Sequence, residues 1–250
     1  MAKIFIFALK FVLQYGKILI LDYFIVQFRC MKIYHGSKKI IEKPSLKGSN
    51  PTNDYGPAFY LTTELDAAKS WACRNDIVGV VSKYDINEKT LSNLKILDLT
   101  NKDKYTVLNW IAILMHFRSL DSTFIANNQL ALNWLSKYYI IVDSYDVIVG
   151  FRADDAYFRF PTRFVSNDLA FEDLDEVFLY GNLGVQYAFI SKAAINSLKF
   201  DGYIECDDTF VGHYYNIVKE ASEKFNVLTN KPRDPQKTYI LDLMRRDNGK

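Results

Sequence analysis

The segment at residues 33–71 constrains the fold more than any other part of the chain. It opens with Ile-Tyr-His-Gly-Ser at 33–37, where a short apolar run leads into an imidazole and a glycine. About twenty residues later, a loop punctuated by Gly and Pro leads into Phe-Tyr-Leu at 59–61 and a helix start at Thr62 or Thr63. A glycine at the end of a strand lets a ligand approach the main chain closely. The segment therefore predicts a binding site framed by two strands, a loop and a helix.

The helix that follows is expected to face the same cleft. Leu65, Ala68 and Trp71 have helical spacing, which brings Trp71 to the side of the helix that Tyr60 can also reach. The alternative is that Tyr60 and Trp71 are ordinary core aromatics.

Changes of hydrophobic period along the rest of the chain predict an α+β protein. Strands are expected at 77–86, 94–99, 145–150, from Gln186 onwards and at 200–204. Helices are expected at 192–198, at 211–225 and in a helical insertion at about 105–139. Within the insertion, Trp110, His116 and Trp134 are expected to be packing residues, since an isolated His on an apolar helix is more often buried than a ligand.

Composition bounds the function classes. The 250 residues are 49% hydrophobic and 15% aromatic, which is enough for one domain with a full core. With 31 basic and 29 acidic residues, the net charge of +2 gives no strong nucleic-acid footprint. Cys30, Cys73 and Cys206 are odd in number and lack metal-ligand spacing, which favours a reducing, cytoplasmic setting without a metal or a disulfide.

The first thirty residues differ from the rest, because their apolar runs are interrupted by charges too often for a membrane span, which needs about 18 apolar residues. No secretory cleavage site is evident. Lysines at seven-residue spacing allow an interfacial membrane helix, but the favoured interpretation is an extension upstream of a functional chain that starts at Met31. The expected organisation is this extension (1–30), one domain (31–228) and a polar C-terminal tail (229–250).

Two motifs in the segment at 33–71 resemble those of a known family. The first two signature motifs of the NAD-using ADP-ribosyltransferases of the His-Tyr-Glu type resemble His35-Gly36-Ser37, followed by the pattern Gly-x-x-Phe-Tyr that ends at Tyr60 and Ala-x-x-Trp that ends at Trp71. That type includes diphtheria toxin and the poly(ADP-ribose) polymerases. The resemblance is more specific to an uncharacterised bacterial branch with Asp-aromatic-Gly-x-x-Phe-Tyr-Leu-Thr-Thr, and it covers residues 32–200. It implies an ADP-ribosyltransferase-like α+β fold, with a split mixed and antiparallel β-sheet core, flanking helices and the helical insertion.

The resemblance also implies roles for these residues, with NAD as the substrate and no metal. His35 would bond the adenosine ribose, and the Gly36 main chain, with Ser37 beside it, would hold the nicotinamide carboxamide. Tyr60 and Trp71 would stack on the nicotinamide ring, a cation–π arrangement worth about 0.5 to 2 kcal/mol.

The third motif departs from the family, because the expected Glu is replaced by Gln186. An amide can bond the 2′-hydroxyl of the nicotinamide ribose but carries no charge, and losing one electrostatic partner commonly costs about 10²–10³ in rate. In the families resembled, members without this Glu are mono-transferases or inactive. A nearby acid such as Glu205, Asp154 or Asp155, or the substrate itself, could restore the charge.

Arg152 and the two carboxylates that follow at 154 and 155 offer a further group of charged residues. They could position a substrate nucleophile, or an acid among them could cap a helix.

The sequence therefore predicts a mono-ADP-ribosyltransferase, a bacterial toxin or effector that acts on a protein, a nucleic acid or a small molecule. An antitoxin partner could cover its cleft. The alternatives are a non-catalytic NAD or ADP-ribose binding module, and a core that merely shares the fold, since fold does not imply function.

Overall fold

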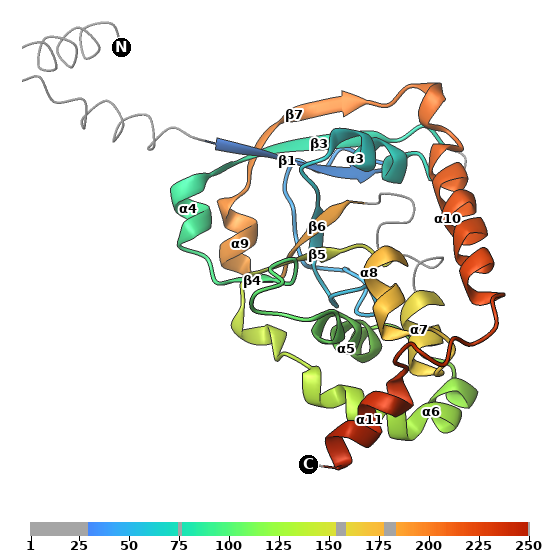
Figure 1. The fold of residues 1–250 in the computed structure, drawn as a ribbon. Helices are drawn as coiled ribbons and strands as arrows, with labels where there is room; N and C mark the ends of the chain where they lie inside the picture. Colours follow the sequence, from blue (N-terminus) through green and yellow to red (C-terminus); the bar gives the residue numbers. More distant parts are fainter. Residues whose placement is uncertain (1–29, 75–76, 154–158, 178–183, 250) are drawn as a thin grey trace, which may run out of the picture.

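The computed structural model describes residues 30–249, except for 75–76, 154–158 and 178–183. The described residues form two sheets with helices around them, an α+β architecture as the sequence predicts (Figure 1). The antiparallel sheet has the order β1 (Cys30–Ser37), β3 (Val80–Asn87), β7 (Lys199–Glu205). The mixed sheet has the order β2 (Phe59–Leu61), β6 (Val185–Phe189), β5 (Val147–Phe151), β4 (Ile96–Asp98), with β4 and β5 parallel.

The two sheets are held together by an apolar layer and by one backbone bridge. Alternate residues of β1 and β3, such as Ile33 and Tyr84, share a buried cluster with Phe59 and Phe189 of the mixed sheet. At one edge, the N–H and C=O groups of Tyr34 bond those of Thr62 at 2.8 and 3.0 Å. The bridge fixes where the end of β1 lies relative to β2.

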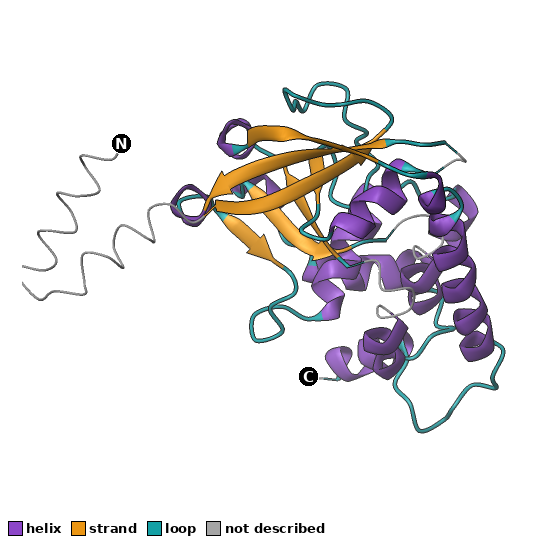
Figure 2. Ribbon diagram, turned by 90° about the horizontal axis from the view of Figure 1, so that it is seen from above, coloured by secondary structure: helices purple, strands orange, loops and turns teal. Residues whose placement is uncertain are grey.

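Most of the helices gather on one side of the strands (Figure 2). Their bounds are α3 (Leu65–Ala72), α4 (Glu88–Ser92), α5 (Val107–Phe117), α6 (Ser122–Leu135), α7 (Arg159–Val165), α8 (Leu174–Val177), α9 (Lys192–Ser197), α10 (His213–Thr229) and α11 (Ile240–Asn248). Helix α5 is apolar on almost every face and lies in the larger hydrophobic cluster, together with residues from the mixed sheet. The helices predicted at 105–139 thus correspond to α5 and α6, between β4 and β5.

Two boundaries differ from the sequence expectation. Helix α3 begins at Leu65 rather than at Thr62 or Thr63, because Thr62 is engaged in the bridge to β1 and its hydroxyl accepts the N–H of Glu64 at 3.2 Å. The apolar spacing from Asn128 to Tyr139 predicts a helix that starts at Asn128. Helix α6 instead begins at Ser122 and is kinked at Asn128. The Asp121 carboxylate caps it by accepting the N–H groups of the first turn.

The last residues contain a helix where the sequence suggests a polar tail. Ile240 at the start of α11 is fully buried, and the Trp134 indole N–H donates to Asp247 at 2.9 Å. A few apolar residues on one side of a short helix are sufficient for docking, and such a pattern is easily hidden in a polar stretch. Among the described residues, no helix has the length and apolar character that a bilayer crossing requires.

Candidate functional site

A cavity of about 650 Å³ lies where the ends of β1 and β2 meet α3. Its volume is within the range of about 300–1,000 Å³ that is typical of small-molecule sites. Its lining comes from β1, β2, α3, β6, α10, the loop before β2 and the residues that follow α3, α5 and β5. It brings together six of the residues predicted from the sequence, namely His35, Gly36, Tyr60, Trp71, Arg152 and Gln186.

His35 is held in one orientation by its neighbours. Its Nδ1 lies 2.7 Å from the carbonyl oxygen of Tyr60, and its ring stacks on Phe59 with centroids 4.3 Å apart. Burial lowers the pKa of His35; the bond to the Tyr60 carbonyl works in the other direction, and the positive charge of Arg74 lowers the pKa further. A neutral ring that donates from Nδ1 keeps a lone pair on Nε2. His35 can therefore accept a hydrogen bond from a hydroxyl in the cavity.

Gly36 has a second reason to be glycine besides the one inferred from the sequence. A Cβ at this position would lie 2.0 Å from the carbonyl oxygen of Ala68 and 2.9 Å from the nitrogen of Ala72, so the helix packs directly on the strand. Tyr34, two residues earlier, directs its N–H and C=O toward Thr62 and away from β3. Because backbone groups alternate along an antiparallel strand, those of Gly36 point the same way, from the free edge of β1 into the cavity.

Tyr60 and Trp71 differ in how firmly they are fixed. The Tyr60 hydroxyl donates to the Gly56 carbonyl at 2.7 Å and accepts the N–H of Tyr55 at 3.1 Å, so it also holds the loop before β2. Burial raises the pKa of Tyr60 well above its usual range, which keeps the hydroxyl a donor. The Trp71 ring lies under the guanidinium groups of Arg74, at 3.6 Å, and of Arg152, at 4.5 Å.

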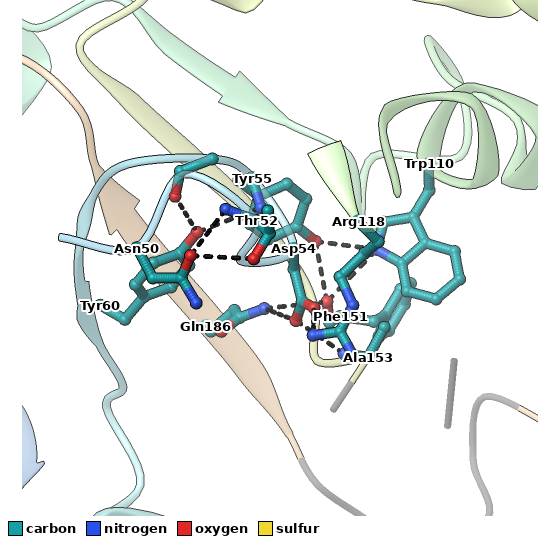
Figure 3. Close-up of polar contacts among 11 residues, drawn as sticks. Asn50, Thr52, Asp54, Tyr55, Tyr60, Trp110, Arg118, Phe151, Ala153 and Gln186 are labelled. Atoms are coloured by element: carbon teal, nitrogen blue, oxygen red, sulfur yellow. Dashed lines mark hydrogen bonds and ion pairs between the residues drawn. The ribbon is translucent and has the colours of Figure 1, made fainter. Parts of the chain in front are cut away.

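Gln186 is paired with a carboxylate from the loop before β2 (Figure 3). Its Nε2 donates to Oδ2 of Asp54 at 2.8 Å and lies 3.3 Å from the carbonyl oxygen of Phe151. Both side chains are buried, with 6% of Gln186 and 8% of Asp54 exposed. Because both contacts are to acceptors, the amide turns its nitrogen to Asp54 and leaves Oε1 as an acceptor.

Asp54 is fixed by two further segments of the chain. Its Oδ2 also accepts the N–H of Ala153 at 2.9 Å, and its Oδ1 lies 3.4 Å from the guanidinium of Arg118. Ala153 follows β5, and Arg118 is the residue at which α5 ends. The carboxylate therefore receives two N–H donors and one positive charge in a nearly dry position.

Helix α5 is linked to Gln186 by a series of hydrogen bonds. The Trp110 indole N–H donates to the Tyr55 hydroxyl at 2.8 Å, and that hydroxyl donates to the Phe151 carbonyl at 2.8 Å. The same carbonyl faces Gln186, so a chain of polar groups runs from the helical insertion to the cavity (Figure 3). Trp110 is buried, as the sequence predicts for a packing residue, and it also carries the first of these hydrogen bonds.

The charges of the described lining residues favour an anionic ligand. Arg74, Arg118 and Arg152 bring three guanidinium groups to the cavity, and Asp54 brings one carboxylate. Guanidinium groups bind phosphate oxygens through paired N–H donors. Within the described part of the chain, no group of three or more His, Cys, Asp or Glu side chains is placed to hold a metal ion.

A comparison with protein families matches residues 31–200 to DUF3990, described as a protein of unknown function. This match covers well over half of the chain. The chain belongs to the DUF3990 family. The matched region contains the cavity residues of β1, β2, α3 and β6, including the Asp54–Gln186 pair. No curated protein and no solved structure matches the chain.

Several residues predicted from the sequence of this DUF3990 protein are not among the lining residues. Ser37 ends β1 outside the cavity, and its hydroxyl donates to the carbonyl of Lys39 at 2.6 Å. Glu205 is exposed at the far end of β7, across β3 from Ser37, and does not line the cavity. Asp154 and Asp155 lie outside the described residues. Glu205 is the one acid of these three that the structure describes, and it does not lie beside Gln186.

Asp54 is the residue that sequence reasoning about this DUF3990 protein missed. The signal was present, because Asp54 opens the Asp-Tyr-Gly-Pro-Ala-Phe-Tyr stretch that contains the second motif. Its relation to Gln186 could not be read locally, since 132 residues separate the two. Arg118 was missed for the same reason, because it joins the cavity only when α5 packs under the mixed sheet.

Proposed function

We propose that the protein is an NAD-dependent mono-ADP-ribosyltransferase, which cleaves the nicotinamide–ribose bond and transfers ADP-ribose to an acceptor. The observation that carries the proposal is the convergence of residues from all three motifs on one cavity: His35 and Gly36, then Tyr60 and Trp71, then Gln186. Gln186 lies far from the other four in the sequence, and a shared cavity is the arrangement that the resemblance to ADP-ribosyltransferases requires. The two-sheet α+β architecture is compatible with the split sheet of that fold.

The geometry offers a group for each part of NAD. The His35 Nε2 lone pair suits the hydroxyl of the adenosine ribose, and the free-edge N–H and C=O of Gly36 suit the donor and acceptor of a carboxamide. The arginines that line the cavity suit the diphosphate. Gln186 Oε1 suits the 2′-hydroxyl of the nicotinamide ribose.

The aromatic residues suit the nicotinamide ring, with a rearrangement at Trp71. The guanidinium of Arg152 lies 4.5 Å from the Trp71 ring, where a stacked nicotinamidium would take its place as the cation.

The test is nicotinamide release from NAD by the purified full chain, measured with NAD binding by calorimetry. We expect release by the wild type and none by Tyr60→Ala, since the substitution removes both the ring and the hydroxyl that holds the loop at Gly56. Tyr203→Ala, an exposed tyrosine of β7, serves as the matched control and should behave as the wild type. A wild type that neither binds NAD nor releases nicotinamide would reject the proposal.

A second candidate is a non-catalytic NAD or ADP-ribose binding module. The observation that favours it is the neutral amide at Gln186, where the resembled enzymes carry a carboxylate. NAD binding without any nicotinamide release by the wild type would select this candidate.

The acceptor and the biological setting extend the same proposal. The acceptor would be a protein, a nucleic acid or a small molecule, as for a bacterial toxin or effector, and an antitoxin would cover the cleft. Cys30, Cys73 and Cys206 are free thiols, as suits a reducing cytoplasm.

A further inference from the structure

We propose that Asp54 is the positioning residue that supplies, through Gln186, the negative charge absent from the third motif. This inference rests on the proposed function, because it assigns a role in the cleavage of the nicotinamide–ribose bond. In this arrangement the carboxylate belongs to the loop before β2, and the amide of β6 carries its effect to the ribose. The acid and the hydrogen-bonding group, combined in one Glu in the resembled enzymes, are here divided between two residues.

The Asp54 carboxylate sets the orientation of the Gln186 amide. An amide can turn its oxygen or its nitrogen to a ligand, and the two choices have opposite hydrogen-bonding character. A carboxylate 2.8 Å away accepts only, so it holds Nε2 of Gln186 and leaves Oε1 for the cavity. The Phe151 carbonyl, at 3.3 Å from the same nitrogen, reinforces this orientation. An Asn in place of Asp54 would remove the preference, because its own amide could present a donor.

The negative charge of Asp54 stabilises the positive charge that develops on the ribose. Bond cleavage leaves both electrons of the C1′–N bond on the nicotinamide nitrogen, which becomes neutral, while positive charge develops on C1′ and O4′ of the ribose. The acceptor then forms its bond to C1′ with its own lone pair and gives its proton to solvent. A negative charge behind the amide polarises its oxygen and stabilises the cationic ribose, and such effects are larger in a dry site than in water. Asp54 takes no proton in either step.

The contacts of the Asp54 carboxylate compensate for its burial. Asp54 is 8% exposed, and a buried carboxylate is tolerated only when it is paired and hydrogen-bonded. The N–H groups of Gln186 and Ala153 both approach Oδ2, while the Arg118 guanidinium lies at 3.4 Å from Oδ1. At that separation Arg118 offsets part of the charge without forming the close bidentate pair that would bind both oxygens.

A purely structural role is the competing explanation, since the same contacts tie the loop at Asp54 to both β6 and the end of β5. The two explanations differ in what Asp54→Asn would do to NAD binding and to stability. If Asp54 serves only to hold the loop, then NAD affinity and Tm should fall together with turnover. If its charge matters, then turnover should fall while NAD affinity is kept.

The experiment compares Asp54→Asn, Gln186→Glu and the double variant that combines them, by nicotinamide release, NAD binding and thermal unfolding. For Asp54→Asn we expect NAD affinity within about threefold of wild type and kcat lower by about 10²–10³. For Gln186→Glu we expect a lower Tm, because two carboxylates in contact repel one another or share a proton. The double variant, with one carboxylate and one amide again, should recover the Tm and bring kcat to within about tenfold of wild type.

Asp146→Asn is the matched control for loss of a structural carboxylate. Asp146 accepts the N–H of Lys95 at 2.9 Å, remote from the cavity lining, so this substitution should leave kcat unchanged. Asp54→Asn with wild-type kcat would overturn the inference while leaving the proposed function intact. So would a double variant that regains its Tm without regaining turnover, or loss of NAD binding by a folded Asp54→Asn chain. A wild type that neither binds NAD nor releases nicotinamide would overturn the proposed function, and the inference with it.

Discussion

The two sides of the cavity are built in different ways. On the strand side, formed by His35, Gly36 and Tyr60, the functional groups are fixed by bonds to nearby backbone, such as that from His35 to the Tyr60 carbonyl. On the network side, formed by Asp54 and Gln186, side chains bond other side chains across 132 residues of sequence. The strand side therefore depends on local backbone geometry, whereas the network side depends on four segments packing correctly at once.

This difference predicts how substitutions on each side affect stability. An added atom on the strand side should clash with backbone atoms, which cannot move aside. An added atom on the network side should clash with side-chain atoms, and a second substitution can remove that clash.

The largest effect is expected for Gly36→Ala on the strand side. Its Cβ would lie 2.0 Å from the carbonyl oxygen of Ala68, so either the strand or α3 must shift. We expect the free energy of unfolding to fall by about 3 kcal/mol, at the upper end for overpacking. Denaturant unfolding of the purified chain measures it, and a wild-type midpoint would show that α3 does not approach β1 so closely.

Gly150→Ala is the matched substitution on the network side. Its Cβ would lie 2.1 Å from the Tyr55 hydroxyl, which is a side-chain atom. Its cost should shrink in a Tyr55→Phe chain, which lacks that hydroxyl. An additive double variant would argue against this contact.

The same contrast explains how much could be predicted from the sequence. His35, Gly36, Tyr60 and Trp71 lie within 37 consecutive residues, so their order and spacing carry the cavity-forming pattern, and the structure brings all four to one cavity. Strand positions such as that of Gln186 also follow from alternation along the chain.

What the sequence could not predict depends on tertiary packing. Nothing local connects Asp54 with Gln186, and Glu205, an acid that follows the third motif in the sequence, is exposed and does not line the cavity. Helix α11 was hidden for a related reason, since the burial of Ile240 depends on contacts made only in the folded chain. Hydrophobic periodicity predicts which face of a helix or strand is apolar, but it does not predict which other element packs against that face.

A medium effect is expected for Tyr55→Phe. This substitution tests whether the hydrogen bonds of the network side orient Gln186 at the cavity. The substitution removes the nearer of two acceptors of the Trp110 N–H, which keeps the Phe151 carbonyl at 3.2 Å, and it removes one buried donor to that carbonyl. We expect unfolding to become easier by about 1.5 kcal/mol. Turnover should fall as well, because the Phe151 carbonyl helps to orient Gln186.

Tyr84→Phe is the control for this prediction. Tyr84 is also fully buried, and its hydroxyl donates to the carbonyl of Ile41, but it lies outside the cavity. It should lose stability to a similar extent and keep wild-type kcat. Equal kcat for Tyr55→Phe and Tyr84→Phe would mean that the network carries no functional orientation.

The smallest effect is expected on the strand side, in the pH dependence that His35 contributes. Its pKa is lowered in the folded chain by burial, against a usual value of about 6.5 in the unfolded chain. Stability from this residue is therefore complete above pH 6.5 or so, and is lost as the pH falls toward the folded pKa, because the unfolded chain binds the proton first. The slope should reach at most about 1.4 kcal/mol per pH unit.

The measurement is the difference in unfolding free energy between wild type and His35→Asn from pH 8 to pH 5, roughly centred on the usual histidine pKa. The difference should be constant at the alkaline end and should change toward less wild-type stability at the acid end. A proton on Nε2 would also remove the lone pair offered to the ribose, so NAD affinity of the wild type should weaken over the same acid range. If the unfolding free energies of the two proteins depend on pH in the same way, then the His35 ring is solvated. The strand side would then have no preorganised acceptor at His35.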